Sequence, residues 1–199
     1  MSDRTRHSLI DAIKSTNSEE RGRGWEQLWT VYKDYVRYLV RRAGAKEGDV
    51  DDIAQDVFDC VARNIDKFNL GDRAGSFRTW LKKIAYHRVT DYYRSQAKCV
   101  GAGEGSGRTD AFGYVPVREQ EADEDEGELA EVRKTYERAL QLARSEFSEA
   151  TVTMFRKAVV DGRPTGDIAD EHDVSQAAVR MAKSRVLRRL RELLGETEG

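Results

Sequence analysis

Proline and cysteine are scarce in this chain, with two of each among 199 residues. Because proline interrupts helices, its scarcity leaves long stretches in which helices can continue. Cys60 and Cys99 stand in unrelated contexts, one within a helical pattern and one at the edge of a glycine-rich stretch, and the three histidines form no ligand spacing with them. The sequence therefore indicates neither a disulfide framework nor a metal centre.

Long apolar runs and a strong net charge are also missing. No run approaches the length that crosses a membrane, and the N-terminal MSDRTRHSLIDAIK lacks the hydrophobic centre of a signal peptide. We therefore expect a cytoplasmic protein with no membrane partner. Charged residues make up 35% of the chain but nearly cancel, leaving a formal net charge of −2. Only local basic patches, and not whole-molecule attraction, could bring such a chain to nucleic acid.

Signatures of catalysis are absent from the sequence. No GxxxxGK[ST] phosphate-binding loop occurs, and the glycines from Gly101 to Gly107 precede acidic residues instead of a helix. Paired carboxylates such as Asp51 and Asp52 are expected on the outer turn of a helix without a pocket, which favours a protein contact over acid–base chemistry. We therefore expect a binding protein that is not an enzyme and needs no cofactor.

Helical spacing dominates the chain, and alternating strand patterns are absent, so the predicted fold class is all-α. Composition changes abruptly after Lys98. Residues 101–128 hold five glycines before Tyr114 and then a run of acids, with little that a core could bury. This pattern predicts two helical modules, residues 1–98 and 129–199, joined by a flexible acidic linker over residues 99–128.

The N-terminal module is predicted to hold three main helices, preceded by a short helix near Leu9 to Lys14. The first main helix is expected to end at Gly44, the second to begin at Asp49 as its cap, and the third to begin at Ser76. The second helix is apolar inside and acidic outside. Expected buried positions are Trp25, Leu28, Trp29, Tyr32, Val36, Leu39 and Val40 in the first helix, Val50, Ile53, Ala54, Val57, Phe58, Val61 and Ile65 in the second, and Phe77, Trp80, Leu81, Ile84 and Ala85 in the third.

The other face of the third helix carries cations interleaved with tyrosines. Cations follow phosphates and aromatic rings stack on unpaired bases, at roughly 1 to 3 kcal/mol per base, so this face suits single-stranded DNA. The alternatives are that the tyrosines pack against the module, that the cations serve solubility, and that Asp91 pairs with Arg88 or Arg94. The residues concerned are Arg78, Lys82, Lys83, Tyr86, His87, Arg88, Tyr92, Tyr93 and Arg94.

The segment SQAAVRMAKSRVLRRLRELL, residues 175–194, predicts a helix with one packed face and one cationic face. Thr165 is expected to cap a short helix before it, with Ile168 and Ala169 pointing inward. Residues 172–174 are expected to form a tight turn into Ser175, a second cap. Two capped helices in tandem indicate a helix-turn-helix, although a basic run alone would fit an ordinary solvated face. Its inward positions are Ala178, Val179, Ala182, Val186, Leu190 and Leu193, and its basic residues are Arg180, Lys183, Arg185, Arg188, Arg189 and Arg191.

These motifs together resemble the bacterial sigma factors of the extracytoplasmic-function group, which retain the second and fourth conserved regions. DVDDIAQDVFDCVARNIDKF is similar to the part that docks on the clamp coiled coil of RNA polymerase, and SFRTWLKKIAYHRVTDYYR to the part that recognises and melts the minus-ten promoter element. The strings FRKAVVDGRPTGDIADEHDVS and AKSRVLRRLREL resemble the planctomycete-type branch of this group. The resemblance covers most of residues 25–194 apart from the linker.

The resemblance implies region 2 over residues 1–98, region 4 over residues 129–199, and initiation of transcription without ATP. The implied partners are the beta-prime clamp and beta flap of core RNA polymerase, promoter DNA in duplex and single-stranded form, and an anti-sigma factor or other regulator. Implied contacts with polymerase are Asp51, Asp52, Gln55, Asp56 and Asp59. Implied minus-ten contacts are Phe68, Asn69, Arg78, Lys82, Lys83, Tyr86, His87, Arg88, Tyr93 and Arg94, with a base pocket formed partly by residues 67–75. Implied minus-thirty-five contacts are Thr165, Ser175, Gln176, Ala177, Arg180, Lys183, Ser184, Arg185 and Arg188.

The chain departs from the pattern of this group at three places. Tyr86 and His87 follow Ile-Ala where the group often has Arg-Asn, residues 143–147 replace a usual Leu-Pro, and residues 178–182 replace Thr-Val-Lys-Ser-Arg. The fold should tolerate these changes, whereas the preferred promoter sequence should change with them. Two other classes of function remain open, a stand-alone helix-turn-helix regulator of duplex DNA and an adaptor whose basic helix binds an acidic protein.

Overall fold

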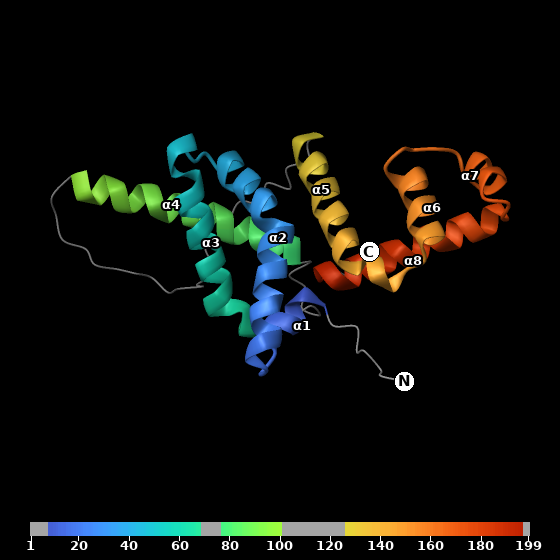
Figure 1. Cartoon of the computed structure of the whole chain (residues 1–199). Coiled ribbons are helices and arrows are strands. Elements are labelled where there is room, and N and C mark those ends of the chain that lie inside the picture. Colours follow the sequence, from blue (N-terminus) through green and yellow to red (C-terminus); the bar gives the residue numbers. More distant parts are fainter. Residues whose placement is uncertain (1–7, 69–76, 101–125, 197–199) are drawn as a thin grey trace.

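A computed structural model describes residues 8–68, 77–100 and 126–196 of the chain. Every regular element within these residues is helical, and no strand occurs among them, which confirms the predicted all-α class. The helices form two groups that lie side by side, as Figure 1 shows.

The first group holds the helices of the N-terminal half. The short helix is confirmed where it was predicted, with a capping box between Ser8 and Asp11. Asn17 caps the next helix by accepting hydrogen bonds from two backbone amides. Gly44 follows its end with a φ of 99°, which favours glycine. The elements are α1 (Leu9–Lys14), α2 (Ser18–Arg42), η1 (Glu47–Asp49), α3 (Val50–Asn64), η2 (Ile65–Lys67) and α4 (Phe77–Val100).

The second group holds the helices of the C-terminal half, and it begins earlier than the sequence predicted. Residues 126–128, assigned to the linker from their composition, form the first turn of a helix, and Cys99 and Val100 end α4. Residues 101–125, the rest of the predicted linker, lie outside the described residues. The elements are α5 (Glu126–Ala143), η3 (Arg144–Glu146), α6 (Glu149–Val159), α7 (Thr165–Glu171) and α8 (Gln176–Leu194).

Two predicted caps are wrong in detail. Asp49 stands at the cap position of α3, but its side chain makes no capping hydrogen bond and instead accepts from the hydroxyls of Tyr92 and Tyr93. Thr165 is the first residue of α7 and Pro164 holds the cap position. Proline has no side-chain group that could cap the helix, and α7 accordingly has no side-chain capping hydrogen bond. The predicted start of α4 at Ser76 falls outside the described residues.

The core of the N-terminal group lies between α2, α3 and α4, and α1 closes its lower end. Gly24 permits the close approach of α1, since a Cβ there would meet the carbonyl carbon of Ala12 at 2.9 Å. Nearly all expected core positions are buried, with Trp25 and Trp80 partly so. Trp29 is the exception, because 42% of it remains exposed.

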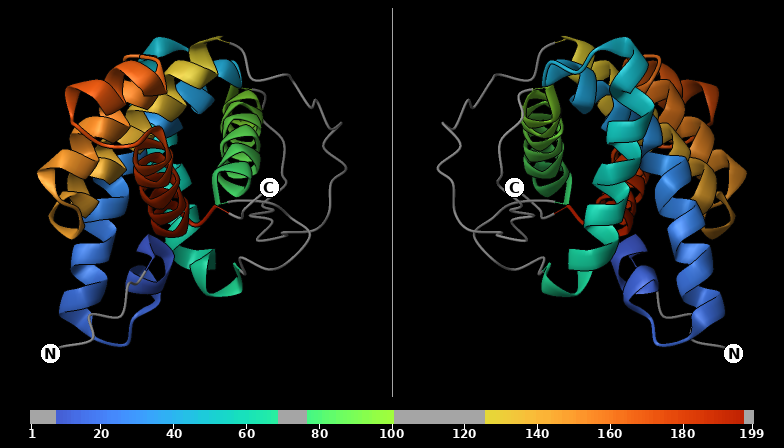
Figure 2. Two further views of the ribbon diagram at one scale, coloured as in Figure 1. Left: turned by 90° about the vertical axis from the view of Figure 1, so that its right-hand side faces the viewer. Right: turned by 90° about the vertical axis from the view of Figure 1, so that its left-hand side faces the viewer.

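The same core continues into the C-terminal group. Ala139 and Leu140 of α5 and Leu190 and Leu194 of α8 belong to the apolar cluster that contains Tyr32 of α2. A separate small cluster of Met154, Ile168, Ala169, Val179 and Ala182 supports the far end, where α6, α7 and α8 meet. The C-terminal end of α8 therefore lies against the N-terminal group, and its other end projects away from it (Figures 1 and 2).

Candidate nucleic-acid and protein interfaces

The pair α7 and α8 forms a helix-turn-helix. Asp173 adopts a φ of 50° in the turn, where a short polar side chain tolerates the left-handed region. Ser175 then caps α8 by accepting a hydrogen bond from the amide of Ala178 at 3.1 Å. Ile168 and Ala169 point inward, as predicted. The turn and the second cap, both predicted from the sequence, are confirmed.

The outward side of α8 is a cationic surface without acidic partners. The cations of this surface are Arg180, Lys183, Arg185 and Arg188. Within the part of the chain that the structure describes, no carboxylate lies within ion-pair distance of them, so their charge is available to an external anion. Among the residues predicted to contact the minus-thirty-five element, only Thr165 is half-buried, and the others are exposed. The exposed set is Ser175, Gln176, Ala177, Arg180, Lys183, Ser184, Arg185 and Arg188.

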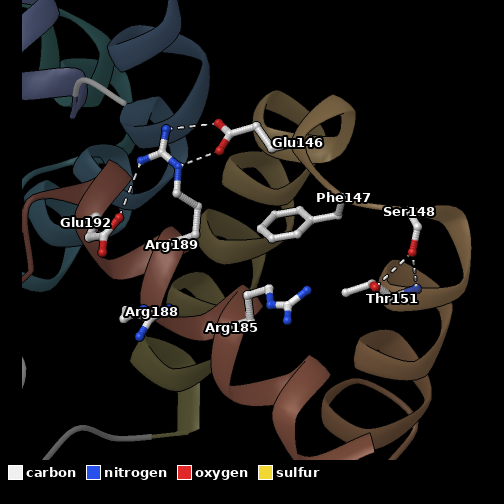
Figure 3. Close-up of a pocket in the computed structure, with 8 residues that line it drawn as sticks. All are labelled: Glu146, Phe147, Ser148, Thr151, Arg185, Arg188, Arg189 and Glu192. Atoms are coloured by element: carbon white, nitrogen blue, oxygen red, sulfur yellow. Dashed lines mark hydrogen bonds and ion pairs between the residues drawn. The ribbon is translucent and has the colours of Figure 1, made fainter. Parts of the chain in front are cut away.

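Arg189 is the one cation of the predicted basic run that is buried in the fold. It is 7% exposed and binds Glu146 through two hydrogen bonds. Arg189 belongs to the wall of a cavity of about 570 Å³ between α8 and the start of α6. In Figure 3, Arg185 extends across this cavity toward Phe147 and Thr151, whereas Arg189 turns toward Glu146. Arg185 and Arg188 of the cationic surface therefore line the same cavity as Arg189, which is held by a carboxylate of the protein itself.

Met181 is a candidate contact that was not predicted from the sequence. It is 63% exposed in the middle of the cationic surface, one turn after Ala177. Exposed Ala and other apolar groups on a recognition helix contact the methyl group of thymine in the major groove. The signal was present in the sequence, because Met181 stands between outward Arg180 and inward Ala182 and is the one large apolar side chain on that side.

The outer face of α3 is acidic, as predicted. Asp51, Asp52, Gln55, Asp56 and Asp59 are all exposed. Arg37 of α2 forms an ion pair with Asp51, with Nε and Oδ1 2.8 Å apart. Exposed acids on a helix can contact a cationic protein surface, although an exposed pair such as Asp51 with Arg37 contributes little to stability.

Trp29 adds an apolar element beside this acidic face. Its ring lies 4.6 Å from that of Phe58 in α3, measured between centroids, and it stays 42% exposed. The helical spacing of α2 placed Trp29 on the buried side because Leu28 and Tyr32 flank it. Its exposure shows that the buried stripe is narrower than the spacing suggested.

The outer face of α4 presents part of the predicted minus-ten set. Lys83, Tyr86 and Arg94 are exposed, with Tyr86 at 51%, and His87 is half-buried against the Tyr86 ring. Asp91 forms two long ion pairs, one from its Oδ2 to Arg88 Nη1 at 3.9 Å and one from its Oδ1 to Arg94 Nη1 at 3.8 Å. The structure therefore pairs Asp91 with both arginines that the sequence offered as its partners.

Other members of that set have structural partners. Phe68 is 7% exposed and stacks on Trp80 with centroids 4.9 Å apart, so its ring does not face solvent as a base contact requires. The hydroxyls of Tyr93 and Tyr92 both donate to Asp49, and Tyr93 also accepts from the amide of Lys46. The hydrogen bond to Asp49 raises the pKa of Tyr92. Asn69 lies outside the described residues.

Arg78 and Lys82, the first two cations of α4, pair with acids of the C-terminal group. Arg78 lies 3.4 Å from Glu196, and Lys82 forms an ion pair with Glu128. Both side chains are partly buried. Glu128 is 46 residues from Lys82 in the sequence, and Glu196 is 118 residues from Arg78. The fold therefore brings these carboxylates to the α4 surface from distant segments.

Neither a metal centre nor a membrane span is found in the described residues. They contain no group of three or more His, Cys, Asp or Glu side chains that could hold a metal ion. They also contain no helix long and apolar enough to cross a membrane.

Comparison with known proteins finds solved structures that are similar to the chain. No curated protein matches the chain. The solved structures that are similar to it include two described as "CnrH in complex with the cytosolic domain of CnrY" and "the sigma factor RpoE in complex with the anti-sigma factor NepR from Bartonella quintana". The first has 21% identity, covers 94% of both chains and has a TM-score of 0.35. The second has 18% identity, covers 85% of this chain and 94% of the other, and has a TM-score of 0.32. At TM-scores this low, neither likeness bears on the function of this chain.

The family model described as Sigma-70 region 2 matches residues 28–99. The match begins at Leu28 of α2, includes the acidic face of α3, and ends at Cys99 in α4. The helix-turn-helix of α7 and α8 lies outside it. The segment of this chain that carries both the acidic α3 face and the cationic α4 face is therefore of the sigma-70 region 2 type.

Proposed function

We propose that the chain is a sigma factor of the extracytoplasmic-function group, which joins core RNA polymerase and directs initiation at specific promoters. The observation that carries this proposal is the match of residues 28–99 to sigma-70 region 2. The exposed cationic helix-turn-helix in the C-terminal half supports it, because a factor of this kind needs a second contact with duplex DNA. The strings quoted from residues 155–175 and 182–193 favour the planctomycete-type branch.

The proposed roles follow from the exposed surfaces. The acidic α3 face binds the beta-prime clamp, and Trp29 adds apolar contact at its edge. The outer face of α4, with Lys83, Tyr86 and His87, meets the unpaired strand of the minus-ten element. Region 2 comprises residues 1–98 and region 4 begins with α5 at Glu126. A contact between region 4 and the beta flap, and an anti-sigma factor or other regulator, complete the partners.

The surface of α8 reads the upstream duplex element. Arg180 and Lys183 supply hydrogen bonds to base edges or phosphates, and Met181 and Ala177 supply apolar contact with thymine methyl groups. Arg185 and Arg188, further along the helix, lie farther from the capped end that enters a major groove and are assigned to phosphates.

Promoter opening is driven by binding energy in this proposal. Single-stranded bases captured on α4 stabilise the opened state, so that no ATP is consumed and the protein is not an enzyme. Residues 67–75, assigned to a base pocket, lie mostly outside the described part of the chain. A factor working with RNA polymerase acts in the cytoplasm.

Binding to purified core RNA polymerase tests the proposal against a stand-alone regulator. We expect the full chain to co-elute with core polymerase and, without polymerase, to shift duplex promoter DNA weakly. Tight duplex binding by the chain alone, with no association with polymerase, would instead identify a helix-turn-helix regulator. Salt-insensitive binding of proteins without any DNA binding would identify an adaptor.

A further inference from the structure

The C-terminal part of α4 extends beyond the helices that support its start, and Figure 1 shows it projecting past α3. Val89 is the last buried side chain among those of α4 that the structure describes, which reach residue 96. After Val89, Tyr92 and Tyr93 are half-buried and the other described side chains are exposed. The two tyrosines pack at the edge of the apolar core. The position of this part of α4 therefore depends on the contacts of these two tyrosines.

Asp49 contacts both tyrosines with its single carboxylate. The Tyr92 hydroxyl donates to Oδ1 at 3.0 Å, and the Tyr93 hydroxyl donates to Oδ2 at 2.9 Å. The Tyr93 oxygen also accepts a hydrogen bond from the backbone amide of Lys46 at 2.8 Å. The hydrogen bond to Asp49 raises the pKa of Tyr92, so this phenol keeps its proton and remains a donor. Both tyrosines are thus hydrogen-bonded to the segment that joins α2 to α3.

Asp49 is available for these contacts because it does not cap α3. An aspartate at the cap position usually accepts a hydrogen bond from an amide of the first helical turn, and this requires an extended backbone. The backbone of Asp49 instead has a φ of −100° and a ψ of −8°, and its side chain makes no capping hydrogen bond. A residue type that ordinarily stabilises the start of its own helix here connects that helix to α4.

We infer that Asp49 is a positioning residue for promoter opening, which acts through Tyr92 and Tyr93 to fix the direction of the strand-binding face of α4; this rests on the proposed function. Tyr93 belongs to the set that the resemblance assigned to the minus-ten element. With its hydroxyl held between Asp49 and the Lys46 amide, Tyr93 supports the helix and leaves the contact with DNA to neighbouring side chains.

The anchored tyrosine adjoins the face that it positions. Tyr93 follows Tyr86 by about two helical turns, which places both on the same side of α4. A captured strand must stack a base on the exposed Tyr86 ring and also bring phosphates to Lys83 and Arg94. Binding through several groups at once is stronger when those groups are held in place beforehand, because less conformational freedom is lost. Without Asp49, the end of α4 can move away from α3 and these groups lose their common register.

Removing either the acceptor or the donors of this contact tests the inference. Asp49→Ala deletes the carboxylate, whereas Tyr92→Phe with Tyr93→Phe deletes the two hydroxyls and keeps both rings. Asp49→Asn is the conservative variant, because its amide can accept from one phenol and donate to the other. The control is Asp161→Ala, at an exposed acid of the C-terminal half.

Four measurements are made on each full-length variant. Circular dichroism reports helix content, and co-elution reports binding to core RNA polymerase. Closed-complex binding and permanganate-reactive thymines are measured with the holoenzyme on a promoter fragment recovered by run-off transcription.

We expect Asp49→Ala and the double Phe variant to keep their helix content, join core polymerase and form closed complexes like the control. Both should give about tenfold fewer reactive thymines, an effect of the size expected for a lost hydrogen bond to a charged group. Asp49→Asn should recover part of the opening. The variant that combines Asp49→Ala with both Phe substitutions should be no worse than either parent, because all three changes act on one contact.

Normal opening by Asp49→Ala, or no recovery with Asp49→Asn, would overturn the inference and leave the proposed function in place. A larger defect in the combined variant would overturn it too, because it would show that the tyrosine hydroxyls contact DNA themselves. Loss of co-elution at intact helix content would overturn it by placing Asp49 in the polymerase contact. If the unaltered chain neither joins core polymerase nor opens a promoter, the proposed function fails and the inference fails with it. If Asp49→Ala lowers the helix content, the double Phe variant decides by the same measurements, and its normal opening overturns the inference.

Discussion

Arg189 of α8 and Glu146 of η3 form a two-point ion pair, with Nε to Oε2 at 2.7 Å and Nη2 to Oε1 at 2.9 Å. Arg189 is 7% exposed, so its charge has little water around it and depends on this carboxylate. The pair connects the recognition helix to the turn between α5 and α6. It therefore helps to fix the position of the helix-turn-helix relative to the rest of the C-terminal half.

Removing Glu146 should destabilise the protein more than removing an acid whose partner is exposed, because its own partner, Arg189, is buried. Glu146→Ala removes both hydrogen bonds from the buried guanidinium and leaves it only the longer ion pair with Glu192, at 4.0 Å. We expect a decrease of about 2 to 3 kcal/mol in the free energy of unfolding. Chemical denaturation monitored by circular dichroism measures it. The control is Glu149→Ala, which breaks an exposed pair with Arg144 and should cost less than about 0.5 kcal/mol. Equal decreases in the two variants would show that the Arg189 pair does not support the fold.

Reversing charge on the acidic α3 face should weaken the holoenzyme. Asp52→Arg with Asp56→Arg changes two exposed positions that make no ion pair in the described structure. We expect unchanged helix content but lower affinity for core polymerase, because repulsion replaces attraction at the contact. Glu137→Arg with Asp161→Arg, reversed at exposed sites in the C-terminal half, should bind like the unaltered protein. Unchanged affinity in the α3 variant would remove this face from the polymerase contact.

Removing cations from α8 should affect duplex recognition and spare strand opening. For Arg180→Ala with Lys183→Ala we expect closed-promoter binding to weaken by about 1 to 3 kcal/mol for each side chain that reads a base edge. The salt dependence of binding should fall for each side chain that meets a phosphate. Arg21→Ala with Arg133→Ala removes two exposed cations elsewhere and should have little effect. The assay compares holoenzyme on closed and pre-opened promoters, and equal failure on both templates would contradict the separate role of α8.

The exposed side chains of α4 should act at the opening step. Because Tyr86 is 51% exposed, Tyr86→Ala should cost little stability, and the same holds for the half-buried His87. We expect both Ala variants to form holoenzyme and closed complexes but to give fewer permanganate-reactive thymines near the start site, since they cannot stack on unpaired bases. Tyr86→Phe, which keeps the ring, should open normally. Normal opening by both Ala variants at unchanged stability would move the role to residues 67–75.

Helical spacing predicted the all-α class and most of the core because local periodicity determines which side of a helix is buried. In α8 it placed Val179, Ala182, Val186 and Leu190 correctly. It could also have identified Arg189 as buried, since that residue lies three positions after Val186 and one before Leu190. The basic character of the run outweighed this signal.

Contacts between distant segments were not predictable from local spacing. Glu128 stands in an acidic, glycine-containing stretch whose composition resembles a solvated linker, yet α2 and α4 supply donors that allow its burial. The resemblance assigned Phe68 and Tyr93 to DNA, whereas packing on Trp80 and a hydrogen bond to Asp49 determine their positions. Such partners depend on how the helices meet in three dimensions.

Run-off transcription with purified core RNA polymerase on a library of genomic fragments tests the central claim most directly. If the chain is a sigma factor, adding it to core polymerase should produce transcripts from a small set of discrete start sites without ATP-driven opening, and core polymerase alone should produce none of them. The Asp52→Arg, Asp56→Arg variant should fail to produce these transcripts. Identical transcripts with and without the chain would contradict the claim.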